Sequence, residues 1–223
     1  ITTFIRALGL SSNDEIREFF GYDDRIEATL EKDTTVNTEQ ALIEVYKKLR
    51  PSEPVTIDGA QNYLYQLFFD AHRYDLSRVG RYKYNKKLSI GARIAGAVLS
   101  RPVVDTLTGE IIADADTSIT KELAALIETK GVSSVYVNVA DHEGNVSEVK
   151  VLSNGMVNLA DFVDLTEEEL KDLDEKGINE QVSFAVLSEI LENADGDDEA
   201  LFATLKERCN DLIPNHITID DIF

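Results

Sequence analysis

The sequence predicts an α+β fold in which a helical, mixed domain is interrupted by a small β-rich module. Apolar residues recur with helical spacing before about residue 70 and again after about residue 160. Between these regions, apolar and polar residues alternate around 135–151, which is typical of a β-hairpin. We therefore divide the chain into the first part of a domain at 1–91, a β-rich module at 92–160, and an acidic helical segment at 161–223 that returns to the first domain.

The first part contains three expected helices. Residues 12–15, Ser-Asn-Asp-Glu, form a capping-box sequence for a helix that Gly21 ends. A second helix starts near Asn37 and ends at Arg50, because the following proline excludes the α conformation at the residue before it. A third helix covers about 58–69, where apolar residues follow the i, i+3, i+4, i+7, i+8 pattern.

The middle and the tail are predicted from shorter signals. The module should contain one helix at 121–129 and short strands at 97–99, 103–104 and 110–113. Residues 166–169 form a second capping box, whose helix ends before Gly177. Two apolar stripes follow, one running from Val182 to Leu191 and one from Leu201 to Leu212, with a polar connection at 195–199.

Charge and cysteine content limit the class of protein. The formal net charge is -20. Residues 1–101 hold 15 Lys/Arg and 14 Asp/Glu, net +1, whereas residues 102–223 hold 7 Lys/Arg and 28 Asp/Glu, net -21. A polyanion is therefore expected to approach the first half only. The single cysteine, Cys209, fits a reducing, cytoplasmic setting and a place in the core, and no run of residues is long and apolar enough to predict a membrane span.

One segment is strongly basic. From Arg73 to Arg101 a single acid accompanies eight cations, Arg73, Arg78, Arg81, Lys83, Lys86, Lys87, Arg93 and Arg101. We expect a loop with short extended pieces and a bend at Gly80. Arginine binds phosphate oxygens bidentately, and the interleaved tyrosines suit base stacking. Pairing of these arginines with the domain's own acids explains the pattern equally well, and chemistry alone leaves both interpretations open.

No catalytic or metal-binding pattern stands out. The three histidines, His72, His142 and His216, lie in loop-like contexts without a further ligand at metal spacing. The acidic runs at 114–116 and 195–199 lack the spacing of a calcium loop. The sequence also lacks a P-loop and a dinucleotide-binding fingerprint.

Several stretches carry a resemblance to a known family. They are residues 4–9 (FIRALG), 49–54 (LRPSEP), 67–70 (LFFD) and 73–88 (RYDLSRVGRYKYNKKL). In this order they resemble the second domain, the β lobe, of the β subunit of bacterial DNA-directed RNA polymerase. Ser52 and Val55 depart from the family, which usually has Gly and Pro there. Residues 94–139 resemble a sandwich-barrel hybrid module inserted in the lobe of some lineages. The chain begins with Ile1 and stops at Phe223, so we expect a fragment.

The resemblance implies a non-catalytic role in transcription. The lobe would form one wall of the cleft for downstream and promoter DNA, with β′, α, ω and sigma subunits as partners. The catalytic Mg²⁺ would be bound by β′, and we expect no cofactor in this fragment and no membrane partner. Arg50 and Arg73 align with lobe arginines that face DNA, and Arg78, Arg81, Lys83, Lys86 and Lys87 complete the candidate nucleic-acid-binding set. The alternative is a protein-interaction module whose acidic part docks a transcription regulator without contacting nucleic acid.

Overall fold

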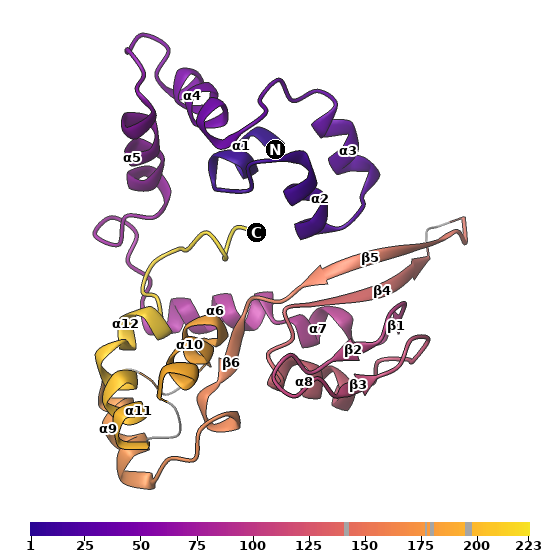
Figure 1. Ribbon diagram of the computed structural model, residues 1–223, viewed down its shortest axis with the longest axis vertical. Helices are drawn as coiled ribbons and strands as arrows, with labels where there is room; N and C mark the ends of the chain where they lie inside the picture. Colours follow the sequence, from indigo (N-terminus) through magenta and orange to yellow (C-terminus); the bar gives the residue numbers. More distant parts are fainter. Residues whose placement is uncertain (141–142, 177, 179–180, 195–197) are drawn as a thin grey trace. The chain divides into compact units, whose positions relative to one another are not determined.

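The computed structural model describes residues 1–223 except 141–142, 177, 179–180 and 195–197. Its α-helices and small antiparallel sheets confirm an α+β fold (Figure 1). The chain forms two compact units, which we call unit 1 (Ile1–Asp75 with His216–Phe223) and unit 2 (Leu76–Asn215). The expectations for His142, Gly177 and the connection at 195–197 concern residues outside those described. The division at 91/92 and 160/161 stays a prediction.

Unit 1 is helical, and polar side chains cap its helices. Its elements are α1 (Thr2–Ala7), α2 (Asn13–Phe20), α3 (Asp24–Leu30), α4 (Thr38–Leu49) and α5 (Ile57–Phe68). Ser12 and Glu15 form the predicted capping box at the start of α2, which confirms the prediction, and Gly21 follows its last residue. Asn37 caps α4, as expected, and Thr56 caps α5. Each cap supplies an acceptor to an otherwise unpaired backbone N–H of the first turn.

The core of unit 1 joins the two ends of the chain. Ala41 and Leu42 of α4 pack with Ala60 and Leu64 of α5 in one buried cluster. Phe223 contacts the rings of α2, with its centroid 5.2 Å from that of Phe19. The C-terminal residues therefore complete the apolar interior of this unit.

A buried ion pair also lies in unit 1. Arg6 Nε is 3.3 Å from Asp33 Oδ2, and the two side chains are 2% and 1% exposed. Arg6 also donates to the Ser11 carbonyl oxygen at 2.6 Å and to the Asn13 side chain. Burial raises the pKa of Asp33, but the hydrogen bonds it accepts, led by those from the hydroxyl and amide of Thr35 and including one from the Thr3 hydroxyl, together hold it well below its usual range.

Unit 2 begins with a helix where the sequence suggested a loop. The structure places α6 at Arg78–Leu88, with Ser77 as its N-cap accepting from the Gly80 N–H. The expected loop with a bend at Gly80 is therefore wrong. The segment has no ordinary apolar stripe, since the residues that α6 buries are Arg81 and Asn85. Because the buried face of this helix is polar, its helical periodicity does not appear in the spacing of apolar residues.

The β-rich part of unit 2 agrees closely with the prediction. Strands β4 (Ser134–Ala140) and β5 (Val146–Leu152) form the expected hairpin, and β1 (Val98–Leu99) adds to β4. Strands β2 (Val103–Val104) and β3 (Ile111–Ala113) form a separate pair. Helix α8 (Lys121–Thr129) has the predicted bounds, and α7 (Ile90–Ile94) was not anticipated. Ile90, Leu99, Ile127 and Val135 belong to their shared core.

The rest of unit 2 packs around a second apolar cluster. Its elements are β6 (Met156–Asn158), the 3-10 helix η1 (Leu159–Asp161), α9 (Glu167–Lys176), β7 (Gln181–Ser183), α10 (Phe184–Ala194), α11 (Asp198–Glu207) and α12 (Cys209–Leu212). Thr166 and Glu169 form the second predicted capping box. Val182 lies in β7, so its assignment to a helical stripe is wrong. Cys209 packs against the cluster, as expected for a core thiol. None of the helices built from described residues is long and apolar enough to cross a bilayer.

Candidate nucleic-acid interface

The predicted basic residues are divided between the two units. Arg50 and Arg73 belong to unit 1. Arg78, Arg81, Lys83, Lys86 and Lys87 all lie on α6 of unit 2. The structure therefore divides the predicted cations between the two units, and each side chain has its own local contacts.

Arg50 is partly used inside the protein. It follows the last residue of α4, and its Nη1 is 2.5 Å from Glu53 Oε1. Its guanidinium carbon lies 4.8 Å from the ring centroid of Tyr63 on α5. Glu53 also accepts from the Tyr46 hydroxyl at 2.8 Å. The side chain remains 44% exposed, so one part of the guanidinium is held while another part faces solvent.

The protonation states of this group follow from its contacts. Hydrogen bonding to Tyr63 and to Glu53 raises the pKa of Arg50. The hydrogen bond from Arg50, followed by the one from Tyr46, holds the pKa of Glu53 below its usual value. The hydrogen bond to Glu53 also raises the pKa of Tyr46. Near neutral pH the arginine and the glutamate are therefore both charged, and their charges largely cancel at a distance.

Arg73 is more available than Arg50. Its side chain is 62% exposed, and its Nε is 4.0 Å from Asp70 Oδ2, at the limit of an ion pair. Asp70 is already engaged, because its Oδ1 accepts from the His72 backbone N–H at 3.0 Å. Arg73 lies in the turn that follows α5, where a flexible side chain can reach a phosphate oxygen.

Two arginines of α6 bind the protein's own carbonyl groups. Arg81 is 4% exposed and donates from Nε to the Pro214 carbonyl oxygen at 2.9 Å. Arg78 donates from Nη2 to the Asp174 carbonyl oxygen at 3.0 Å. Internal pairing, which the sequence left open, therefore applies to these two side chains, each of which donates to a backbone carbonyl oxygen.

The lysines of α6 form an exposed cationic face. Lys83, Lys86 and Lys87 are exposed and stand at helical spacing i, i+3 and i+4. The helix contains no acid, and Lys86 Nζ is 6.0 Å from the Tyr82 ring centroid. Two of the lysines occupy the last turn, where the helix dipole favours positive charge. These residues present point charges suited to a polyanion.

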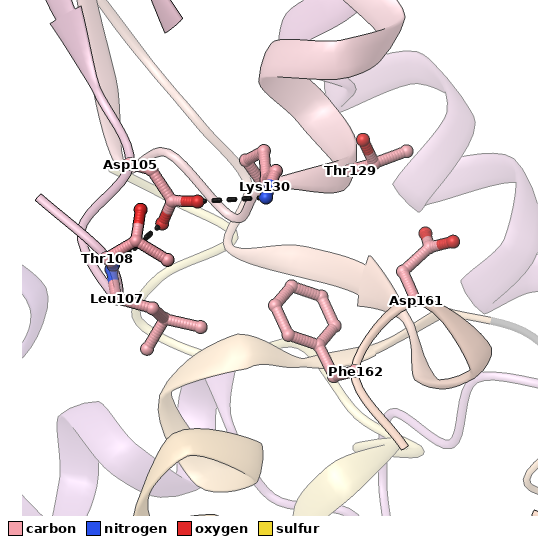
Figure 2. Close-up of a pocket in the computed structure, with 7 residues that line it drawn as sticks. All are labelled: Asp105, Leu107, Thr108, Thr129, Lys130, Asp161 and Phe162. Carbon is pink, nitrogen blue, oxygen red and sulfur yellow. Dashed lines mark hydrogen bonds and ion pairs between the residues drawn. The ribbon is translucent and has the colours of Figure 1, made fainter. Parts of the chain in front are cut away.

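A separate hollow lies in unit 2, with a volume of about 360 Å³. Figure 2 shows the residues that line it, namely Asp105, Leu107, Thr108, Thr129, Lys130, Asp161 and Phe162. Lys130 Nζ is 3.0 Å from Asp105 Oδ2, and this contact holds the pKa of Asp105 below its usual value. Lys130 and Asp105 neutralise each other, and the rest of the lining combines the apolar side chains of Leu107 and Phe162 with Asp161 and two threonines. Sequence reasoning did not find this site, and its residues carry no recognisable pattern.

Comparison with known proteins identifies the family. A family model described as RNA polymerase Rpb2, domain 2, matches residues 1–95. The DNA-directed RNA polymerase subunit beta of Acetivibrio thermocellus is 45% identical over 223 residues, which is 100% of this chain and 17% of that protein. The corresponding subunits of Clostridium acetobutylicum and Alkaliphilus oremlandii are each 43% identical, over 223 and 222 residues.

The similarity extends through both units. All three relatives align with 100% of this chain, so the β-rich module and the acidic tail are shared with them. The chain spans 17% of the length of these relatives. The basic stretch 73–88, which first suggested the resemblance, lies within the matched domain. The chain therefore belongs to the family of bacterial RNA polymerase β subunits.

Proposed function

We propose that this chain is part of the β subunit of a bacterial DNA-directed RNA polymerase and forms a non-catalytic wall of its DNA cleft, the β lobe. The similarity to β subunits carries this proposal, because it extends over the whole chain. In the complete enzyme the β′, α, ω and sigma subunits would be partners, transcription would take place in the cytoplasm, and β′ would bind the catalytic magnesium.

The β-rich residues 94–139 would form a sandwich-barrel hybrid module. Their short antiparallel strands and single helix support it.

The geometry favours Arg73 as the first DNA contact and Arg50 as the second. Arg73 is the more exposed side chain, and its ion pair with Asp70 is long, at 4.0 Å. Arg50 keeps an exposed edge although Glu53 and Tyr63 hold its guanidinium. The exposed lysines of α6 would add less directional attraction. Arg78 and Arg81 would serve the proposed site indirectly, by fixing α6 to the carbonyls of Asp174 and Pro214.

The test uses the complete polymerase with Arg73→Ala or Arg50→Ala in β. Each lost phosphate contact should shorten the lifetime of promoter complexes and make log lifetime fall less steeply with log salt, because fewer counterions rebind to the DNA on dissociation. Arg25→Ala is the control, because Arg25 is 91% exposed, lies on α3 and is outside the candidate set. Unchanged lifetime and slope in both test variants would reject a DNA role.

A second candidate function is docking of a transcription regulator on unit 2. The hollow between Leu107 and Phe162 favours it, because Leu107 is 56% exposed beside a cavity large enough for a side chain. Leu107→Ser should then abolish the response to a regulator while promoter-complex lifetime stays unchanged. An unaltered response to the regulators of the organism's polymerase would reject this function.

A further inference from the structure

We propose that the exposed face of α5 makes uncharged contacts with an unpaired DNA strand, with Tyr65 stacking on a base. The inference rests on the proposed DNA role of unit 1 and extends it from phosphate contacts to base contacts. It is carried by the composition of this face, by its rigidity and by the arginines beside it.

After Asp58 in its first turn, the exposed face of α5 lacks charge, in a chain where charge is common. Charged residues make up 29% of the protein, yet none occurs between Asp58 and Asp70. The exposed positions in that interval include Gln61, Asn62, Tyr65 and Gln66. Amides donate and accept hydrogen bonds, and an aromatic ring offers a flat apolar surface. Such a surface suits a partner that presents both polar edges and flat rings.

The helix holds these side chains on a rigid support. On its opposite side Ala60 and Leu64 are 2% and 4% exposed within the core of unit 1. Gln61 and Tyr65 are one turn apart, as are Asn62 and Gln66, so the four positions form two adjacent rows. Tyr65 is 55% exposed, and its ring is 6.0 Å from that of Phe69 at a tilt of 42°. That contact supports the ring while more than half of the residue stays open.

The arginines identify the class of partner. The Arg50 guanidinium lies over Tyr63, which borders the exposed face in the middle of α5. Arg73 stands in the turn after the C-terminal end of the same helix. Arg50 and Arg73 each pair with a neighbouring acid but stay partly exposed, so each can bind a phosphate. The uncharged positions of α5 suit the bases of the same strand. Stacking on Tyr65 requires an unpaired base, because a base within a duplex has no free face.

The main experiment compares matched tyrosines in the complete polymerase. Tyr65→Ala should shorten the lifetime of promoter complexes about tenfold, a typical loss for one stacked base. Tyr65→Phe keeps the ring and should retain most of that lifetime. Tyr22→Ala is the control, because Tyr22 is 75% exposed and precedes α3, away from α5 in the sequence. It should behave as the wild type.

The salt dependence of promoter-complex lifetime distinguishes stacking on Tyr65 from the proposed DNA role of the arginines. Loss of an uncharged contact should shorten the lifetime without changing its salt slope, whereas Arg73→Ala should change both. If the arginine variants lower the slope and Tyr65→Ala keeps the wild-type lifetime, the inference is wrong and the DNA role stands. If neither the arginine variants nor Tyr65→Ala change the lifetime or its salt slope, the DNA role itself is rejected.

Two further outcomes test the nature of the partner. Promoters carrying single abasic sites in the melted region should show one position where base removal weakens the wild-type complex but not the Tyr65→Ala complex. If every abasic position weakens both complexes equally, stacking on a base is rejected. If Tyr65→Ala instead impairs assembly of the polymerase from its subunits, the face contacts protein, and the inference is overturned.

Discussion

The interior around Arg6 and the surface around Arg50 use the same chemical group in different ways. Arg6 is buried, and its donors bind Asp33, the Ser11 carbonyl and the Asn13 side chain. Arg50 is 44% exposed, and its partners leave one edge of the guanidinium in solvent. A buried guanidinium must be fully paired because desolvation is costly, whereas a half-exposed one remains able to bind a ligand. Burial, rather than local charge density, therefore separates arginines that stabilise this fold from those that suit a DNA contact.

The largest expected difference comes from replacing each of these arginines with methionine. Arg6→Met leaves the Asp33 carboxylate buried without its charged partner, which typically lowers the free energy of unfolding by about 3–5 kcal/mol. Arg50→Met exposes its partners to water and should change stability far less. Urea denaturation of the 223-residue chain measures both. Equal losses of unfolding free energy in the two variants would contradict the distinction between a buried, structural arginine and a half-exposed one.

A smaller loss is expected for Arg81→Lys on α6. Lysine keeps the charge but lacks the planar fork that reaches the Pro214 carbonyl, so a charged buried hydrogen bond is lost. Such bonds contribute about 1.5–3 kcal/mol. Lys83→Arg is the matched reverse change at an exposed position and should alter stability by less than about 0.5 kcal/mol. Denaturation of both variants, followed by far-UV circular dichroism, provides the comparison.

The pH dependence of stability gives a third, smaller difference. Asp33 has a pKa below its usual value in the folded protein. Its stabilising contribution is therefore present above the unfolded pKa of about 4 and is lost as the pH falls toward the folded value. Asp33→Asn should unfold more easily at neutral pH and should lose less additional stability between about pH 5 and about pH 3. Urea titrations at the two pH values test this. An equal acid-induced loss in both proteins would show that Asp33 is not responsible.

Several elements with a clear local signal were predicted correctly from the sequence. The Ser12 capping box, helix α8 and the β4–β5 hairpin depend on residues close together in the chain, and all three were found. Helix α6 was missed because its buried side is polar. The Pro214 carbonyl that Arg81 binds is 133 residues away, so no local pattern marks that contact. The exposed face of α5 was missed for another reason. The candidate residues were selected for positive charge, and this face has no charged residue between Asp58 and Asp70.

The candidate site was predictable only as a set of residue types. Sequence reasoning selected cations, and the family resemblance ranked Arg50 and Arg73 first. It could not separate Arg81, which is 4% exposed, from Lys83 two residues later, which is exposed. That difference follows from the orientation of α6 against the segment at Pro214, which is a tertiary property. Similar charges in one stretch of sequence therefore acquire different roles through packing.

The smallest expected effect is the most informative about Arg50. Glu53→Gln removes the charge that neutralises Arg50, while the amide oxygen still accepts from the Tyr46 hydroxyl. Stability should hardly change, because both charged side chains are about half exposed. If Arg50 binds a phosphate, loss of the adjacent acid should lengthen promoter-complex lifetime in the complete polymerase, most clearly at low salt, where charge is least screened. Glu44→Gln on α4 is the control, since its partner is Lys48. A Glu53→Gln lifetime equal to that of Glu44→Gln at every salt concentration would show that Glu53 neither shields nor competes for Arg50, and would leave Arg73 as the main DNA contact of unit 1.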